Sequence, residues 1–127
     1  MPFLRNAWYV AGFSEEVVAG QMLARRILDC PILLLRGSDG TVAAMVDRCP
    51  HRFAPLSMGS FDRAAVTCRY HGLAFGGDGA CSHNPHGPTA GLRVQTWPVR
   101  EQDGLLWVWP GAADQGAASS PPRQSML

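Results

Sequence analysis

Lysine is absent from this sequence of 127 residues, and all 11 basic side chains are arginine. The 10 acidic residues leave a formal charge of only +1, which argues against nucleic acid as a main partner. No apolar run approaches the length needed to cross a bilayer, and the first five residues do not resemble a signal peptide. We therefore expect neither a membrane partner nor export, and we predict a cytoplasmic location.

The sequence also lacks internal repeats and long helical patterns. Charged residues make up 17% of it and hydrophobic residues 46%, which is typical of a globular chain rather than a disordered one. Its length suits one domain with a modest core. Two of its four cysteines, Cys30 and Cys81, are interpreted as small buried side chains, because a disulfide is not expected without an export signal.

The remaining cysteines lie in two short loops that each combine a thiol with an imidazole. These loops are Cys49-Pro50-His51 and Cys68-Arg69-Tyr70-His71, and 16 residues separate them. Soft thiolates select zinc, copper(I) or iron–sulfur centres, and imidazole suits zinc or iron. The two loops therefore predict a metal centre with Cys49, His51, Cys68 and His71 as its ligands.

The mixed composition of each loop favours iron over zinc. A structural zinc finger usually takes like ligands from each loop, as in Cys-x-x-Cys with His-x(3–5)-His. Two mixed loops allow both cysteines to bind one iron and both histidines the other, which is the Rieske [2Fe–2S] arrangement. A zinc-stapled β module used for protein contacts stays open as an alternative.

Several segments resemble the amino-terminal domain of Rieske aromatic oxygenases, and most of all vanillate O-demethylase oxygenase subunits. The segments are N-A-W-Y-V-A-G at 6–12, C-P-H-R-F-A-P-L-S-M-G at 49–59, C-R-Y-H-G at 68–72, H-N-P-H-G at 83–87 and G-L-L-W-V-W-P at 104–110. The resemblance implies an all-β fold, an antiparallel sandwich or small barrel with a smaller cluster-binding subdomain at about 47–85. It places the Rieske domain at 1–110. Residues 111–127 are rich in Ala, Gly, Ser, Gln and Pro, and this composition predicts a flexible tail or truncated linker.

The same resemblance implies the cofactor and the partners. The cofactor is a Rieske-type [2Fe–2S] cluster, an NAD(P)H-dependent flavin reductase is the electron donor, and an oxygenase catalytic domain with a mononuclear non-haem iron is the acceptor. In such oxygenases the electron usually crosses to a neighbouring subunit, which leaves a homo-oligomer open.

Residues around the ligands are expected to shape the centre. We expect the arginines to raise the potential slightly and offer a positive rim to an acidic partner, or else to be ordinary solvated side chains. Phe53, Tyr70 and Leu73 are expected to exclude water. The predicted surroundings are Arg48, Arg52, Phe53, Arg69, Tyr70, Gly72, Leu73 and Pro85.

Hydrogen bonds to the sulfurs tune a Rieske centre within roughly −150 to +300 mV. High-potential members supply two of them from a Ser and a Tyr hydroxyl. The comparable positions here are Leu73 and Phe75, neither of which donates, so we predict a potential at the low end. A second metal site at His83 and His86 is not expected, because no acidic ligand lies near them in the sequence.

Short strands with Gly/Pro turns and no long helix are predicted along the chain, and this pattern by itself indicates an all-β sandwich or small barrel. One hairpin is expected to turn at Ser38-Asp39-Gly40 and to lead the chain towards Cys49. Pro31 is expected to interrupt the chain just before the first strand of this hairpin. A second hairpin is expected to pair 94–97 with 105–109 around Asp103-Gly104.

Two functions follow from these observations. In the first, the chain is an electron-transfer protein of the aromatic-catabolism type, with no substrate of its own. In the second, it is a fragment or shortened form of an O-demethylating monooxygenase that is active only when joined to a catalytic domain. Catalysis by the chain alone is not expected.

Overall fold

A computed structural model describes residues 7–50, 54–62, 65–69, 72–85, 87–111 and 121. In these ranges the chain forms short β-strands and two 3₁₀ turns, and every strand pairing is antiparallel. The predicted all-β class is confirmed. Among the described residues, no helix has the length and apolar character that a membrane span requires.

The strands are β1 (Tyr9–Phe13), β2 (Met22–Ile27), β3 (Cys30–Arg36), β4 (Val42–Val46), β5 (Ser60–Asp62), β6 (Ala65–Thr67), β7 (Ala74–Gly76), β8 (Cys81–His83), β9 (Thr96–Trp97), β10 (Val99–Gln102) and β11 (Leu105–Val108). The two 3₁₀ turns are η1 (Ser14–Glu16) and η2 (Leu56–Met58).

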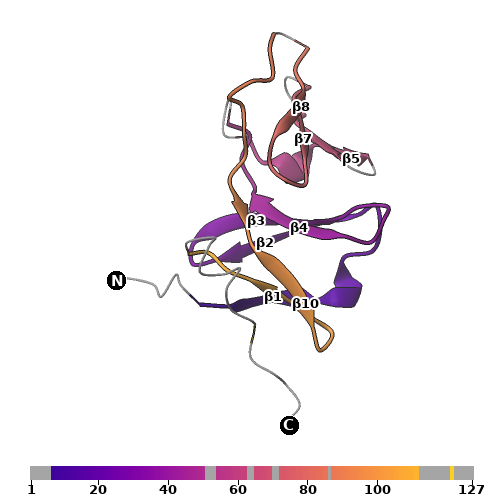
Figure 1. Cartoon of the computed structure of the whole chain (residues 1–127), viewed down its shortest axis with the longest axis vertical. Helices are drawn as coiled ribbons and strands as arrows, with labels where there is room; N and C mark the ends of the chain where they lie inside the picture. The colour runs from indigo at the N-terminus through magenta and orange to yellow at the C-terminus, as the bar shows by residue number, and fades with distance from the viewer. Residues whose placement is uncertain are drawn as a thin grey trace.

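Three small sheets form successive layers (Figure 1). The order β2-β3-β4-β9 defines a central sheet, with β1-β11-β10 on one side of it and β5-β6-β7-β8 on the other. The third sheet, contributed by residues 60–83, lies at one end of the molecule and forms the smaller part of the fold. This arrangement agrees with the predicted sandwich with a smaller subdomain.

The apolar run in β3 is explained by burial on both faces of the central sheet. Ile32 and Leu34 belong to the core shared with β1, β9 and β11, whereas Leu33 and Leu35 belong to the core shared with β6, β7 and β8. All four side chains are at most 3% exposed. Because successive strand residues point to opposite faces, a strand covered on both sides needs apolar residues at every position. The second of these cores also contains Cys49 and Cys68.

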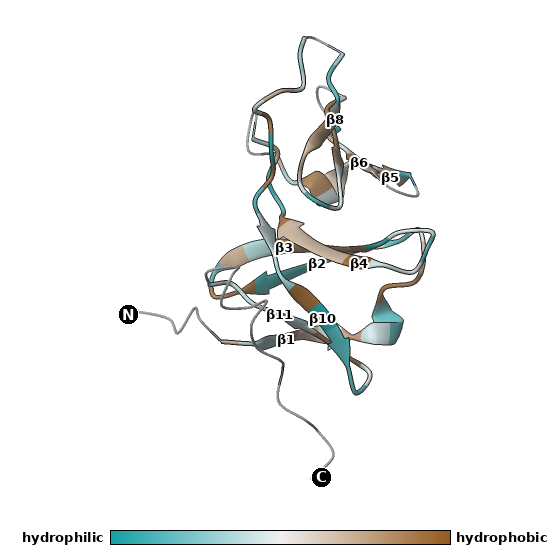
Figure 2. Cartoon of the chain, in the orientation of Figure 1, coloured by the Kyte–Doolittle hydropathy of each residue, from teal (hydrophilic) through white to brown (hydrophobic). Residues whose placement is uncertain are grey.

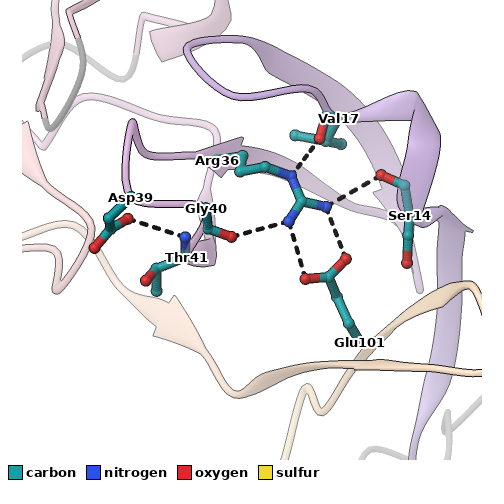
Figure 3. A network of polar contacts seen from close by, with 7 residues as sticks. All are labelled: Ser14, Val17, Arg36, Asp39, Gly40, Thr41 and Glu101. Atoms are coloured by element: carbon teal, nitrogen blue, oxygen red, sulfur yellow. Dashed lines mark hydrogen bonds and ion pairs between the residues drawn. The ribbon is translucent and has the colours of Figure 1, made fainter.

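Arg36 at the end of β3 joins the central sheet to the sheet below it (Figure 3). Its guanidinium donates two hydrogen bonds to the carboxylate of Glu101 on β10, at 2.9 and 2.8 Å. It also donates to the carbonyl oxygens of Ser14, Val17 and Gly40. In Figure 2, β10 changes from brown to teal along its length, as its sequence Val-Arg-Glu-Gln leads one to expect.

Two local predictions are wrong. Pro31 does not interrupt the strand: it lies inside β3, paired with Arg26, and its carbonyl accepts a hydrogen bond from the Asp47 N–H. A proline is tolerated here because the pairing of β3 with β4 begins only at Ile32, so the missing N–H of Pro31 removes no hydrogen bond from that ladder. The later hairpin is formed by β10 and β11, while Thr96 and Trp97 pair with β4 instead. Pro98 separates β9 from β10, so the chain changes sheet at that point.

Of the predicted tail at 111–127, the structure describes only Gly111 and Pro121. Pro121 is buried, and its carbonyl accepts a hydrogen bond of 2.9 Å from the Gln102 side-chain amide. At this residue the chain therefore contacts the β10–β11 hairpin. The remainder of the predicted tail lies outside the described residues.

Candidate metal centre

Both predicted ligand cysteines lie inside the core between the central sheet and the small sheet. Cys49 follows β4 and is fully buried, and Cys68 follows β6 and is 2% exposed. The two thiols belong to one packed cluster and neither forms a disulfide. The fold thus brings together two thiols that are 19 residues apart in the sequence: Cys68 directly follows β6, and Cys49 lies three residues after the end of β4.

The two loops that begin at these cysteines have the same closure. The Cys49 N–H donates to the Ala54 carbonyl at 2.8 Å, and the Cys68 N–H donates to the Leu73 carbonyl at 2.7 Å. In both loops the acceptor is the fifth residue after the cysteine. Because each hydrogen bond closes a loop over the same number of residues, the two loops are equal in size.

Gly72 ends the second loop with a backbone conformation that favours glycine. Its φ is +72°, and its N–H donates to the Cys68 carbonyl at 3.1 Å. A β-carbon at this position would lie 3.4 Å from Cγ of Pro85, so Pro85 lies directly against the end of the second loop. Gly72 and Pro85 are therefore placed together, and their role as surroundings of one centre stays a prediction.

Gly59 brings the two loops close to each other. It follows η2, and a β-carbon built on it would lie 1.9 Å from the carbonyl oxygen of Thr67 and 3.3 Å from the backbone nitrogen of Arg69. These two residues flank Cys68 in the sequence. Only a residue without a side chain lets the end of the first loop approach the start of the second this closely.

Hydrocarbon surrounds the two thiols on the described sides. Leu56 and Phe75 are fully buried and Leu73 is 3% exposed, and all three belong to the cluster that contains both cysteines. The role of Leu73 in excluding water from a cluster stays a prediction. Arg48 and Arg69, which are adjacent in sequence to the two cysteines, are exposed.

The other predicted site residues are His51, Arg52, Phe53, Tyr70 and His71, and they lie outside the described residues, as does His86. His83 is exposed on β8. In the ranges that the structure describes, no group of three or more His, Cys, Asp or Glu side chains has the arrangement of a metal site. The four-ligand assignment therefore stays a prediction for its two histidines.

Sequence reasoning missed a polar contact beside the first loop. Asp47, two residues before Cys49, is only 6% exposed, and its carboxylate accepts hydrogen bonds from Ser57 in η2. The pair is ten residues apart and follows no periodic pattern, so only the folded loop reveals it. A lone Asp before a Cys-x-His motif gives no signal by itself.

The described donors fit an iron–sulfur cluster. Two buried thiols that form no disulfide, held within one apolar cluster, are soft ligands in a water-excluded place. Two neutral imidazoles added from the same two loops would complete the Rieske ligand set.

The chain belongs to the Rieske [2Fe–2S] domain family, whose model matches residues 7–98. This family indicates a Rieske-type [2Fe–2S] cluster as the cofactor. The match covers both ligand loops and the strands that carry them.

The relatives are oxygenase components. The chain is 53% identical over 123 residues to the oxygenase component of dicamba O-demethylase from Stenotrophomonas maltophilia, covering 92% of this chain and 36% of the relative. It is 44% identical over 115 residues to the vanillate O-demethylase oxygenase subunit of Pseudomonas sp. (strain HR199 / DSM 7063), covering 86% and 31%. The predicted kinship with vanillate O-demethylase is confirmed, although the dicamba relative is more similar.

Solved structures agree. The crystal structure of apo dicamba monooxygenase matches with a TM-score of 0.84 and 50% identity, covering 94% of this chain and 37% of that one. The oxygenase in a complex with the ferredoxin of carbazole 1,9a-dioxygenase matches with a TM-score of 0.77 and 27% identity, covering 95% and 31%. The chain thus spans about a third of the length of its oxygenase relatives.

Proposed function

We propose that this chain is the one-electron relay of an aromatic-type Rieske oxygenase. In this proposal Cys49 and Cys68 bind one iron of the cluster, and His51 and His71 bind the other. The acceptor is a mononuclear non-haem iron site that these 127 residues do not supply. The observation that carries the proposal is the pair of loops closed by equivalent hydrogen bonds, which place two buried thiols outside any disulfide in one core.

The cluster, when bound, supplies a site that accepts and releases a single electron. The chain's own residues hold that site and control its surroundings. Leu56, Leu73 and Phe75 keep water from the sulfur ligands, and none of their side chains donates a hydrogen bond to sulfur. We therefore propose a potential at the low end of the Rieske range, as in oxygenases and their ferredoxins.

The exposed positive charges beside the cysteines suggest what kind of electron donor binds there. Arg48 and Arg69 are exposed next to the two cysteines and give the site a positive rim for an acidic electron carrier. An NAD(P)H-dependent flavin reductase is the proposed source of electrons, delivered directly or through a ferredoxin. The carbazole 1,9a-dioxygenase complex, in which an oxygenase is bound to a ferredoxin, supports the second route.

The second candidate function is that of a larger O-demethylating monooxygenase to which this chain contributes the Rieske domain. The coverage of about a third of each relative favours it, and so do the names of the dicamba and vanillate relatives. The cytoplasmic location and a homo-oligomer belong to this candidate and stay predictions. A zinc-stapled module is not proposed, because the family is defined by an iron–sulfur cluster.

An electron count and a product assay test the relay. The cluster-loaded chain, reduced without oxygen and titrated with a one-electron oxidant, should release one electron per chain. The matched Cys68→Ser variant should release none. With reductase, NADH and a methoxylated benzoate, the chain alone should give no demethylated product. Product formation would overturn the relay assignment, and so would a chain that stores no electron.

A further inference from the structure

Asp47 is the one buried charged side chain among the residues that the structure describes. It comes directly after β4 and two residues before Cys49. One carboxylate oxygen accepts the Ser57 backbone N–H at 2.7 Å, and the other accepts the Ser57 hydroxyl at 2.6 Å. Both oxygens are thus taken up by a single residue ten positions further along the chain.

This contact encloses the first ligand loop. The inner closure is the hydrogen bond from the Cys49 N–H to the Ala54 carbonyl, and the contact between Asp47 and Ser57 forms an outer closure around it. The backbone of Asp47 is itself fixed to the central sheet, since its N–H donates to the Pro31 carbonyl at 2.9 Å. Through Asp47, Ser57 therefore connects η2 to the central sheet as well as to the first ligand loop.

The position of η2 decides how the thiols are covered. Leu56, which precedes Ser57, is fully buried in the cluster that contains Cys49 and Cys68. Gly59, which follows η2, lies against the backbone on either side of Cys68. A shift of η2 would therefore move the hydrocarbon over both thiols and loosen the contact between the two loops.

Burying a carboxylate is unfavourable, and its hydrogen bonds offset that cost only in part. None of the ion pairs among the described residues includes Asp47. A neutral pair would close the loop at a smaller cost, but hydrogen bonds to a charged acceptor are roughly twice as strong and hold a tighter geometry. The charged pair is thus suited to holding the loop in one fixed position.

We propose that Asp47 and Ser57 are positioning residues that hold the first ligand loop closed over the cluster and so set its exposure to water and its potential. The inference rests on the proposed role of Cys49 as a ligand. Loosening the loop admits water, which stabilises the extra negative charge of the reduced state. Removing the carboxylate charge also favours that state, so both kinds of change raise the potential.

The test compares variants of the cluster-loaded chain. Ser57→Ala should raise the midpoint potential and speed cluster loss to a chelator by about tenfold, as expected for one lost charge-assisted hydrogen bond. Ser57→Thr, which keeps the hydroxyl, should restore both values. Asp47→Asn should also raise the potential. The matched control is Asp39→Asn: Asp39 accepts the Thr41 N–H in the hairpin at the other end of β4, so neither value should change.

A Ser57→Ala variant with wild-type potential and wild-type rate of cluster loss would overturn the proposal. So would a variant that melts at a lower temperature but keeps its potential, because that result assigns the pair a structural role alone. If Asp47→Asn does not fold, the two Ser57 variants decide. A wild-type chain that holds no iron would instead be a failure of the proposed function.

Discussion

At the scale of single residues, Arg36 shows how one side chain holds separate layers together. Its side chain is 13% exposed, and it serves five acceptor atoms from β10, the η1 region and its own hairpin (Figure 3). Buried guanidinium groups are tolerated when all their donors find partners. Arg36 has this environment, whereas most ion pairs at a protein surface add little to stability.

Removing this side chain should be costly. Arg36→Ala leaves three carbonyls and one carboxylate without their donor, so we expect a loss of about 2–4 kcal/mol in the free energy of unfolding. Urea unfolding of the chain measures it. Arg26→Ala is the control, since Arg26 is 66% exposed and its pair with Asp29 spans 3.8 Å; it should change stability by less than about 0.5 kcal/mol. Equal effects of the two variants would contradict the role of Arg36.

The Glu101 partner makes part of this stability dependent on pH. The hydrogen bonds from Arg36 lower the pKa of Glu101 below its usual value, against the opposing effect of burial. A carboxyl whose pKa is lower in the folded state stabilises the fold above its unfolded pKa of about 4.3, and that contribution is lost as the pH falls through the folded pKa. The stability difference between wild type and Glu101→Gln should therefore be constant above about pH 5 and shrink below about pH 4. A stability difference that grows as the pH falls would contradict the lowered pKa of Glu101.

The ligand assignment is also tested at one residue. His71→Cys places a thiolate where a neutral imidazole is proposed, and the added negative charge disfavours reduction. The midpoint potential should fall, as measured by a redox titration followed by EPR. His83→Cys is the control, because His83 is exposed on β8, and it should leave the potential unchanged. An unchanged or higher potential in His71→Cys would argue against His71 as a ligand.

At this scale, the sequence predicts site residues that lie close together along the chain. The two Cys-x-His-type loops are visible in the sequence because their ligands lie within four residues of each other. The contact between Asp47 and Ser57 was missed because it joins two ordinary polar residues through a fold that no pattern encodes. Arg36 was missed for the same reason, since its partner Glu101 is 65 residues away.

At the scale of elements, the close approach of the two ligand loops depends on Gly59. The loops are each closed by their own hydrogen bonds, but their spacing is fixed where η2 meets the end of β6. A side chain there would push the Thr67 carbonyl, which belongs to the backbone and has little freedom to move. The loops would then be separated although both cysteines remain.

Gly59→Ala should consequently lower both stability and iron content. A β-carbon 1.9 Å from a carbonyl oxygen forces a backbone shift. We therefore expect the free energy of unfolding to fall by about 2–4 kcal/mol. Gly87→Ala is the matched control, because its nearest contact would be an ordinary 3.8 Å from the Asn84 side chain. Thermal unfolding and iron analysis of both variants check this. A Gly59→Ala chain with full iron and unchanged stability would show that the loops do not depend on this approach.

Strands with strong apolar patterns were predictable, and short polar ones were not. The run from Ile32 to Leu35 and the strand before Cys49 stand out because the central sheet is covered on both faces. β10 reads Val-Arg-Glu-Gln and has only one apolar residue, so its pairing with β11 was assigned wrongly to 94–97. Tertiary pairing, rather than propensity, decides which short strand closes that hairpin.

At the scale of the whole molecule, the three layers leave the ligand loops at one end of the central sheet. β4 and β6 both lead into a cysteine, and the arginine next to each cysteine is exposed; these arginines form the positive rim of the proposed function. Composition alone did not show this, because the chain is nearly neutral. The fold class was predictable from short strands and turns, but the order of the sheets was not.

The rim should govern the encounter with an acidic electron carrier. With a reduced plant-type [2Fe–2S] ferredoxin as the probe, Arg48→Glu and Arg69→Glu should each slow electron transfer by about tenfold at low ionic strength. Added salt should shrink the difference. Arg100→Glu, an exposed arginine on β10, serves as the control and should have little effect. Stopped-flow rates that respond equally to all three substitutions would contradict docking at this rim.

The central claim is that the two loops hold one two-iron cluster, and metal analysis of the purified chain tests it most directly. We predict about two iron atoms and two acid-labile sulfides per chain, with a rhombic EPR signal after reduction by dithionite. Cys49→Ser and Cys68→Ser should abolish both. A chain that carries a single zinc ion, with neither sulfide nor signal, would contradict the account.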